Sequence, residues 1–224
     1  MVSRGACRQS IFHDDRDRRR FLSLLADVVE EMHWSCLTYC LMGNHFHLVI
    51  RLQQGGLSDG MQRLNGAYGR WFNDRHERSG HVFERRFWSK LVRRQAHLLA
   101  LARYVALNPV AAGLVLDPGD WPWSAHRALV GQAYDALVDV SSALAYFDDD
   151  LERARLSYRS LVAQHDATDA AALDVGLLDP RDRLAHDLRV VRAHLDLGRS
   201  VGEIADAMGR SRRTIQRRVS AKGV

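Results

Sequence analysis

Residues 35–52, which read SCLTYCLMGNHFHLVIRL, predict a β-hairpin. Gly43-Asn44 is a turn signal, and the apolar runs on either side of it favour two antiparallel strands. Side chains alternate between the two faces of a strand, so His45 and His47 are expected on the same face of the second strand. Two imidazoles held one residue apart on rigid backbone can bind one divalent metal ion.

The periodicity of the remaining sequence predicts an α+β fold. Helices are expected over residues 14–33, 57–78 and 95–107, and one further extended segment is expected over residues 81–92. This order matches a ferredoxin-like antiparallel sheet with packed helices. The first strand of that sheet is central, and only Met1-Val2-Ser3 is available for it, so we expect an abbreviated strand. Asn108-Pro109 is expected to end the third helix.

Composition is typical of a globular cytoplasmic protein. Of the 224 residues, 46% are hydrophobic and 26% charged, and no apolar run approaches the roughly 20 residues of a membrane helix. We therefore expect no membrane contact and no signal peptide. An odd set of three cysteines, Cys7, Cys36 and Cys40, fits a reducing compartment. The net charge of +5 favours polyanionic binding partners, but it does not by itself establish nucleic-acid binding.

Basic residues are concentrated in two segments of the chain. Six of them lie between Arg210 and Lys222 with no acidic residue, and a second group follows Glu84. Such blocks form either functional basic surfaces or solvated faces. In the second group we predict phosphate contacts for Arg85, Arg86 and Lys90, while the neighbouring aromatic residues could stack on bases or belong to the core.

The C-terminal sequence VGEIADAMGRSRRTIQRRV, residues 201–219, resembles a helix-turn-helix. Gly209 allows the sharp turn, and Ser211 would cap the second helix. The outward residues of that helix suit phosphates and base edges, and they are Arg212, Arg213, Thr214, Gln216 and Arg217. The alternative is a basic surface helix that binds no specific site. We favour duplex DNA as the partner because spacing and charge agree.

Tyr104 and Asn108 lie four residues apart, so on a continuing helix one lies above the other. A phenol, with an ordinary pKa of about 10, is a useful nucleophile when a metal stabilises the developing charge. The amide oxygen of Asn108 could complete a metal site with His45 and His47. The alternative is that Tyr104 is a core-edge aromatic residue and Asn108 a helix cap before proline.

These phrases, taken together, resemble the REP-associated tyrosine transposase family, which belongs to the HUH single-tyrosine transposases. The resemblance covers about residues 1–131 and rests on Arg4-Gly5 and the segments CLMGNHFHLVI, GHVFERRFWSK, RYVALNPVAAGLV and DWPWSAHRAL. It implies cleavage of single-stranded DNA near hairpins, with a 5′-phosphotyrosine and a free 3′-hydroxyl as products. It further implies that His45, His47 and Asn108 hold Mg²⁺ or Mn²⁺ and that Tyr104 is the nucleophile.

We therefore expect three parts: a transposase domain over 1–131, a linker or irregular helical region over 132–178, and a helix-turn-helix unit over 179–224. The leading hypothesis is a metal-dependent transposase or single-strand DNA nuclease, a monomer or homodimer associated with the bacterial nucleoid. The alternative is a catalytically impaired DNA-binding protein, a regulator or decayed transposase, that acts through the C-terminal unit. A zinc site of Cys36, Cys40, His45 and His47 is disfavoured because the cysteines fall inside a predicted strand.

Overall fold

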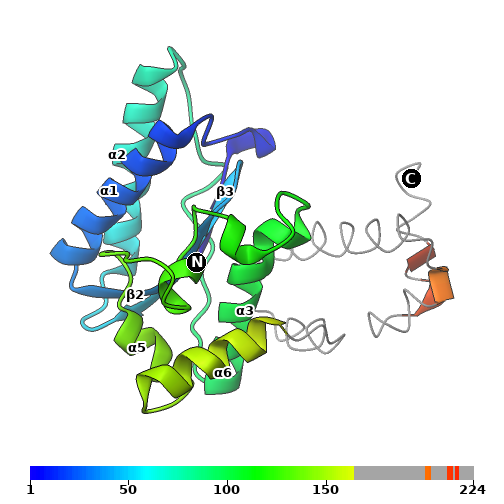
Figure 1. The fold of residues 1–224 in the computed structure, drawn as a ribbon. Helices are drawn as coiled ribbons and strands as arrows, with labels where there is room; N and C mark the ends of the chain where they lie inside the picture. The colour runs from blue at the N-terminus through cyan, green and yellow to red at the C-terminus, as the bar shows by residue number, and fades with distance from the viewer. Residues whose placement is uncertain (164–199, 203–210, 214, 217–224) are drawn as a thin grey trace.

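The computed structural model describes residues 1–163, 200–202, 211–213 and 215–216. In this part of the chain a small antiparallel sheet lies between helices α1 and α2 on one side and α3 on the other (Figure 1). The elements, in chain order, are β1 (Val2–Arg4), η1 (Ala6–Arg8), α1 (Asp15–Glu31), β2 (Trp34–Leu41), β3 (His45–Leu52), α2 (Leu57–Arg75), α3 (Gln95–Ala111), η2 (Pro118–Asp120), α4 (His126–Leu129), α5 (Val140–Leu144) and α6 (Leu151–Ala163).

The predicted hairpin is confirmed as β2 and β3. Its turn closes where the Met42 backbone N–H donates to the His45 carbonyl at 2.9 Å, and Cys40 lies opposite His47 in the register. Every residue of β2 is buried, because helices cover both faces of this strand. A strand that is covered on both faces carries an almost continuous apolar run, as this sequence does.

The first strand is short, as expected, but the central strand of the three-stranded sheet is β3, and β1 lies beside it. On one edge β1 pairs with β3, with Val2 opposite His47 and Arg4 opposite His45. On its other edge, Val2 and Trp88 exchange backbone hydrogen bonds of 2.9 Å, and Glu84 donates to the Arg4 carbonyl at 2.9 Å. The ferredoxin-like α+β plan is thus confirmed, although residues 82–88 join the sheet through isolated bridges instead of a regular strand.

Helix α1 begins where the sequence predicts it to begin. The Asp14 side chain caps the helix by accepting hydrogen bonds from the backbone N–H groups of Arg16 and Asp17. The buried face of α1 packs on the sheet, and the ring of Phe21 is centred 4.5 Å from that of Phe46. Phe46 points to the face opposite His45 and His47, so the apolar side of β3 meets α1 and the histidine side meets α3.

Helix α3 continues through Pro109, so the prediction that it ends at Asn108-Pro109 is wrong. A proline removes one backbone donor, and near a helix end this loss affects only the last turn. Ala112 still donates to the Asn108 carbonyl at 3.0 Å, and the helix ends before Gly113, whose φ of +68° suits a glycine after a helix. Tyr104 and Asn108 therefore lie on one unbroken helix.

The described part of the expected linker, residues 132–163, joins the same core. Val138 bridges to Cys36 of β2, and Tyr158 of α6 is fully buried. The His126 ring nitrogen Nδ1 lies 3.0 Å from the Tyr158 hydroxyl and connects α4 to α6. Side chains on both sides of residue 131 thus share one core, while the division of the chain into three parts stays a prediction.

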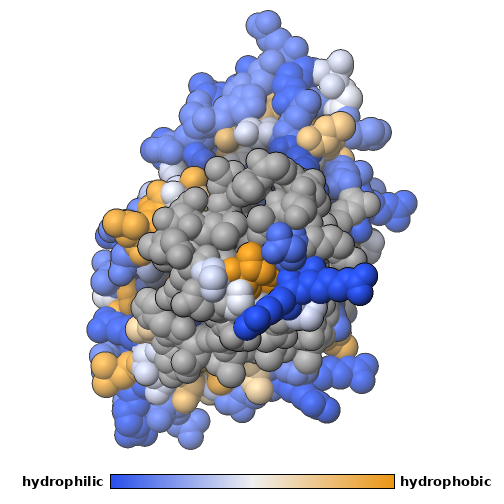
Figure 2. Space-filling view, turned by 90° about the vertical axis from the view of Figure 1, so that its right-hand side faces the viewer, coloured by the Kyte–Doolittle hydropathy of each residue, from blue (hydrophilic) through white to orange (hydrophobic). Residues whose placement is uncertain are grey.

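The described surface is predominantly hydrophilic on the face shown in Figure 2, with apolar side chains in separate small groups. Among the described residues, the most exposed large apolar side chains are Leu116 and Tyr134, at 97% and 92%. No helix in the described ranges is long and apolar enough to cross a membrane.

Candidate functional site

Two histidines of β3 form the centre of the candidate site. His45 and His47 are 4% and 2% exposed, and their ring centroids lie 4.9 Å apart with the rings nearly perpendicular. Their backbone is held on both sides, because β1 and β2 both pair with β3. The predicted common face for the two imidazoles is therefore confirmed.

A neighbouring amide sets the tautomer of His45. The Asn44 Nδ2 donates to the Arg8 carbonyl at 3.1 Å, so its Oδ1 is the atom that faces His45 Nδ1 at 2.8 Å. An amide oxygen only accepts, so Nδ1 of the neutral ring must carry the proton. The lone pair is then on Nε2, and a hydrogen bond from the other ring nitrogen is the usual support of a metal-ligating histidine.

Helix α3 brings Tyr104 and Asn108 to the histidine face. The Tyr104 ring lies 5.3 Å from the His47 ring, centroid to centroid, in a perpendicular arrangement. Asn108 is 1% exposed, and its Nδ2 contacts the Tyr104 carbonyl at 3.4 Å. Asn108 does not cap the helix, because the C-cap is Ala112. Tyr104 is also buried, at 6% exposure.

The Asn108 Oδ1 atom is the strongest sign of a ligand at this site. It is buried and accepts no hydrogen bond from any of the described residues. A buried acceptor without a partner costs about 1–3 kcal/mol, which a bound cation would remove. Two imidazoles and one amide oxygen leave several coordination positions open for water and phosphate, so these residues fit a divalent metal ion.

The competing zinc site of Cys36 and Cys40 finds no support. Both thiols are fully buried, and burial raises the pKa of each well above its ordinary value, which disfavours the thiolate that binds zinc. Cys40 instead donates to the Met42 sulfur at 3.6 Å.

The basic residues predicted to contact DNA lie in two separate hollows. Arg85 and Arg86 line a cavity of about 660 Å³ between α2 and residues 80–87. Lys90 lines another, of about 630 Å³, near the end of β3 and the start of α3. The sequence alone treats these three residues as one cluster, whereas the path of the chain separates them.

Only part of the predicted helix-turn-helix falls within the described residues. Arg212, Arg213 and Gln216 are exposed and line a hollow with residues 200–202, and Ile215 next to them is buried. Thr214 and Arg217, which we also predict to contact DNA, lie outside the described residues.

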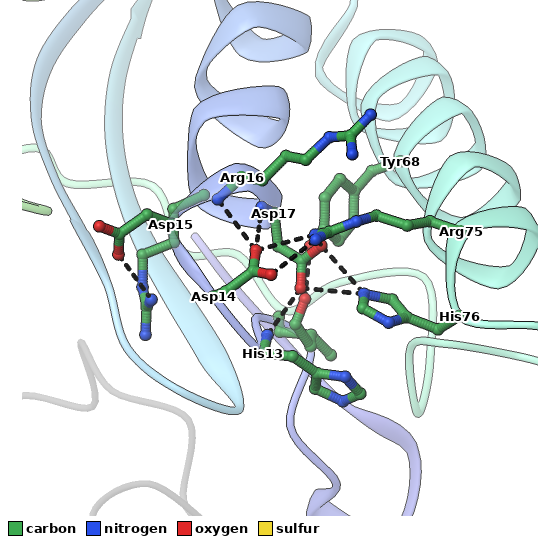
Figure 3. Close-up of polar contacts among 10 residues, drawn as sticks. His13, Asp14, Asp15, Arg16, Asp17, Tyr68, Arg75 and His76 are labelled. Atoms are coloured by element: carbon green, nitrogen blue, oxygen red, sulfur yellow. Dashed lines mark hydrogen bonds and ion pairs between the residues drawn. The ribbon is translucent and has the colours of Figure 1, made fainter.

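The sequence patterns did not predict one further group of side chains that could bind a metal ion. His13, Asp17 and His76 offer donor atoms that all lie within 4.8 Å of one another (Figure 3). His13 and Asp17 are four residues apart, but His76 follows much later in the sequence. Spacing of this kind is a weak signal, so only the packing of α1 against α2 reveals the group.

Known proteins resemble the N-terminal half of this chain. Residues 1–108 of the 224 match the family described as "Transposase IS200 like". This similarity of the N-terminal part to the IS200-like transposases supports a transposase function that acts on DNA.

A relative from Haemophilus influenzae, with the provisional name REP-associated tyrosine transposase, is 27% identical over 129 residues. The alignment covers 51% of this chain and 72% of the relative. No solved structure matches the chain.

Proposed function

We propose that this chain is a metal-dependent HUH-type tyrosine transposase that cuts hairpin-bearing single-stranded DNA. The observation that carries the proposal is that helix α3 places Tyr104 and Asn108 beside the histidine face of the sheet. Tyr104 lies against His47. One turn further along the same helix, the buried Oδ1 atom of Asn108 accepts no hydrogen bond from any of the described residues. His45, His47 and Asn108 would hold the metal, and Tyr104 would be the nucleophile.

In the proposed reaction the Tyr104 hydroxyl oxygen attacks a backbone phosphorus atom. A bond forms between that oxygen and phosphorus, the bond from phosphorus to the 3′-oxygen breaks, and the leaving oxygen takes up a proton to become a free 3′-hydroxyl. The phenolic proton passes to solvent or a nearby base. A bound Mg²⁺ or Mn²⁺ would polarise the phosphate and stabilise the charge that develops on the oxygens.

Two features of the chain support the reaction geometry. The β-sheet fixes His45 and His47, and one unbroken helix fixes Tyr104 relative to Asn108. Because Tyr104 is 6% exposed, access of a phosphate to its hydroxyl requires neighbouring side chains to move.

The test is a covalent adduct assay. The full chain is incubated with hairpin-bearing single-stranded oligonucleotides and Mn²⁺ and run on a denaturing gel, and an adduct is expected from the unchanged chain alone. Tyr104→Phe removes one oxygen and should abolish the adduct while single-strand binding persists. Tyr39→Phe is the matched control, since Tyr39 lies in β2 and its hydroxyl donates to Asp135 at 2.7 Å. An adduct in Tyr104→Phe would reject Tyr104 as the nucleophile.

The alternative, a DNA-binding protein without cleavage, rested on an abbreviated first strand. β1 forms hydrogen bonds along both edges, so that structural argument loses its force. Duplex binding through Arg212, Arg213 and Gln216, together with Thr214 and Arg217, remains part of our proposal as a second activity of the same chain. Binding to duplex DNA with no adduct on any hairpin substrate would favour the alternative.

A further inference from the structure

A second cluster of metal-ligating side chains joins the start of α1 to the end of α2. His13 directly precedes the α1 cap, Asp17 lies in the first turn of α1, and His76 follows the last residue of α2. The rings of His13 and His76 are centred 4.4 Å apart. In Figure 3 the Asp17 carboxylate lies between the side chains of α2 and the His13 backbone.

The carboxylate of Asp17 organises this cluster. Asp17 is fully buried, and it accepts hydrogen bonds from the His13 backbone N–H at 2.7 Å and from His76 Nε2 at 3.0 and 3.1 Å. Arg75 also pairs with Asp17. A buried carboxylate needs such partners, because its charge is costly to remove from water.

Arg75 does not depend on Asp17 for its own charge partner. Its two terminal nitrogens contact the two oxygens of Asp14 at 2.8 and 2.6 Å, which is a bidentate pair. Nη1 also contacts Asp17, so a cation on Asp17 would shift Nη1, whereas the pairing of Nη2 with Asp14 would remain. With neutral imidazoles, the carboxylates of Asp14 and Asp17 balance the guanidinium groups of Arg75 and Arg78, so the cluster has no net positive charge to repel a cation.

The donor set fits a transition metal of the zinc type. Ligands at about 2.0–2.1 Å from a tetrahedral zinc lie about 3.3 Å from one another. The His76 Nε2 atom lies 3.0 Å from Asp17 Oδ1, and it would ligate once its proton moves to Nδ1. His13 is exposed, so a fourth position would be open to water.

We propose that His13, Asp17 and His76 form a second metal site, separate from the His45–His47 face, which binds Zn²⁺ and clamps the start of α1 to the end of α2. Two imidazoles and a carboxylate are a donor set that suits zinc. The metal links two helices that otherwise meet here through hydrogen bonds and ion pairs, so the site is structural.

Calorimetric titration with Zn²⁺ tests this site in the full chain. His45→Ala/His47→Ala serves as the background, so that zinc at the other candidate site does not contribute. One zinc ion per chain is expected to bind. Adding His13→Gln or His76→Gln should weaken binding by about 100-fold or more, because even outer-shell partners of a metal are worth about 10–100-fold. His33→Gln is the matched control, since His33 is an exposed histidine just beyond α1.

Absence of zinc binding in a folded background, or equal affinity after His76→Gln, would overturn the proposal. A second measurement covers a background that fails to fold: the visible absorption of Co²⁺ bound to the otherwise unchanged chain. A loss of band intensity in both His13→Gln and His76→Gln supports the site, and an intensity unchanged in both overturns it, because the His45–His47 face contributes equally in all three proteins. The outcome is independent of the adduct assay, because zinc binding here requires neither Tyr104 nor DNA.

Discussion

Two glycines of α2 should respond in opposite ways to the same substitution. A Cβ atom at Gly60 would lie 2.4 Å from two ring atoms of Trp34, whereas a Cβ at Gly66 would meet nothing closer than an Arg70 nitrogen at 3.6 Å. Trp34 is 5% exposed and opens β2, so its ring has little room to retreat. The backbone of α2 therefore lies directly against the Trp34 ring at Gly60.

The magnitudes follow from these two surroundings. Alanine is favoured over glycine within a helix by about 1 kcal/mol, so Gly66→Ala should stabilise the protein by about 0.5–1 kcal/mol. At Gly60 the same gain is outweighed by overpacking, which costs about 1–3 kcal/mol and more where a rigid ring must move. Gly60→Ala should therefore destabilise the protein by about 1–2 kcal/mol.

Urea denaturation of the two variants beside the unchanged chain measures both values. A difference of about 1.5–3 kcal/mol in the free energy of unfolding is expected between the variants, or roughly 3–12 °C in Tm for a protein of this size. The m-values should agree, since neither change alters the surface exposed on unfolding. If Gly60→Ala proves as stable as Gly66→Ala, the close approach of α2 to Trp34 is refuted.

Three further changes probe the core, the metal site and the C-terminal segment. Burial lowers the pKa of His126, whose Nδ1 lies 3.0 Å from the Tyr158 hydroxyl, so its contribution to stability is present above a pH of about 6.5 and declines as the pH falls. His126→Gln should flatten the dependence of Tm on pH between about 7 and 5, and an unchanged slope would contradict this. Asn108→Ala should reduce the rise in Tm on adding Mn²⁺ and should abolish the adduct, whereas an undiminished rise would exclude the amide as a ligand. Arg212→Ala/Arg213→Ala should weaken duplex binding in a mobility-shift assay and reduce its salt dependence by up to about two counterions, with the adduct unaffected.

Local patterns account for the parts of this fold that were predicted correctly. The turn at Gly43-Asn44, the alternation along β3 and the start of the helix near Asp14 each depend on neighbours within a few residues, so the sequence contains the whole cause. The end of α3 was mispredicted because Pro109 has a local preference against helix, while packing and the turn at Gly113 decide the actual end.

The candidate site was predicted in its residues but not in its environment. Spacing places His45 and His47 on one face, yet it says nothing of the Asn44 amide that sets the tautomer, since that amide is fixed by the Arg8 carbonyl. The buried oxygen of Asn108 likewise becomes visible only when α3 covers the sheet.

The sequence by itself determined the hairpin, the helices and the common face of two histidines, because hydrogen bonding and side-chain alternation within a strand or helix are set by nearby residues. Tertiary structure alone decided which distant residues meet. It placed β1 between β3 and residues 82–88, separated Arg85 and Arg86 from Lys90, and brought His76 to Asp17. Such contacts depend on how whole elements pack, and no local pattern records the partner that each element will find.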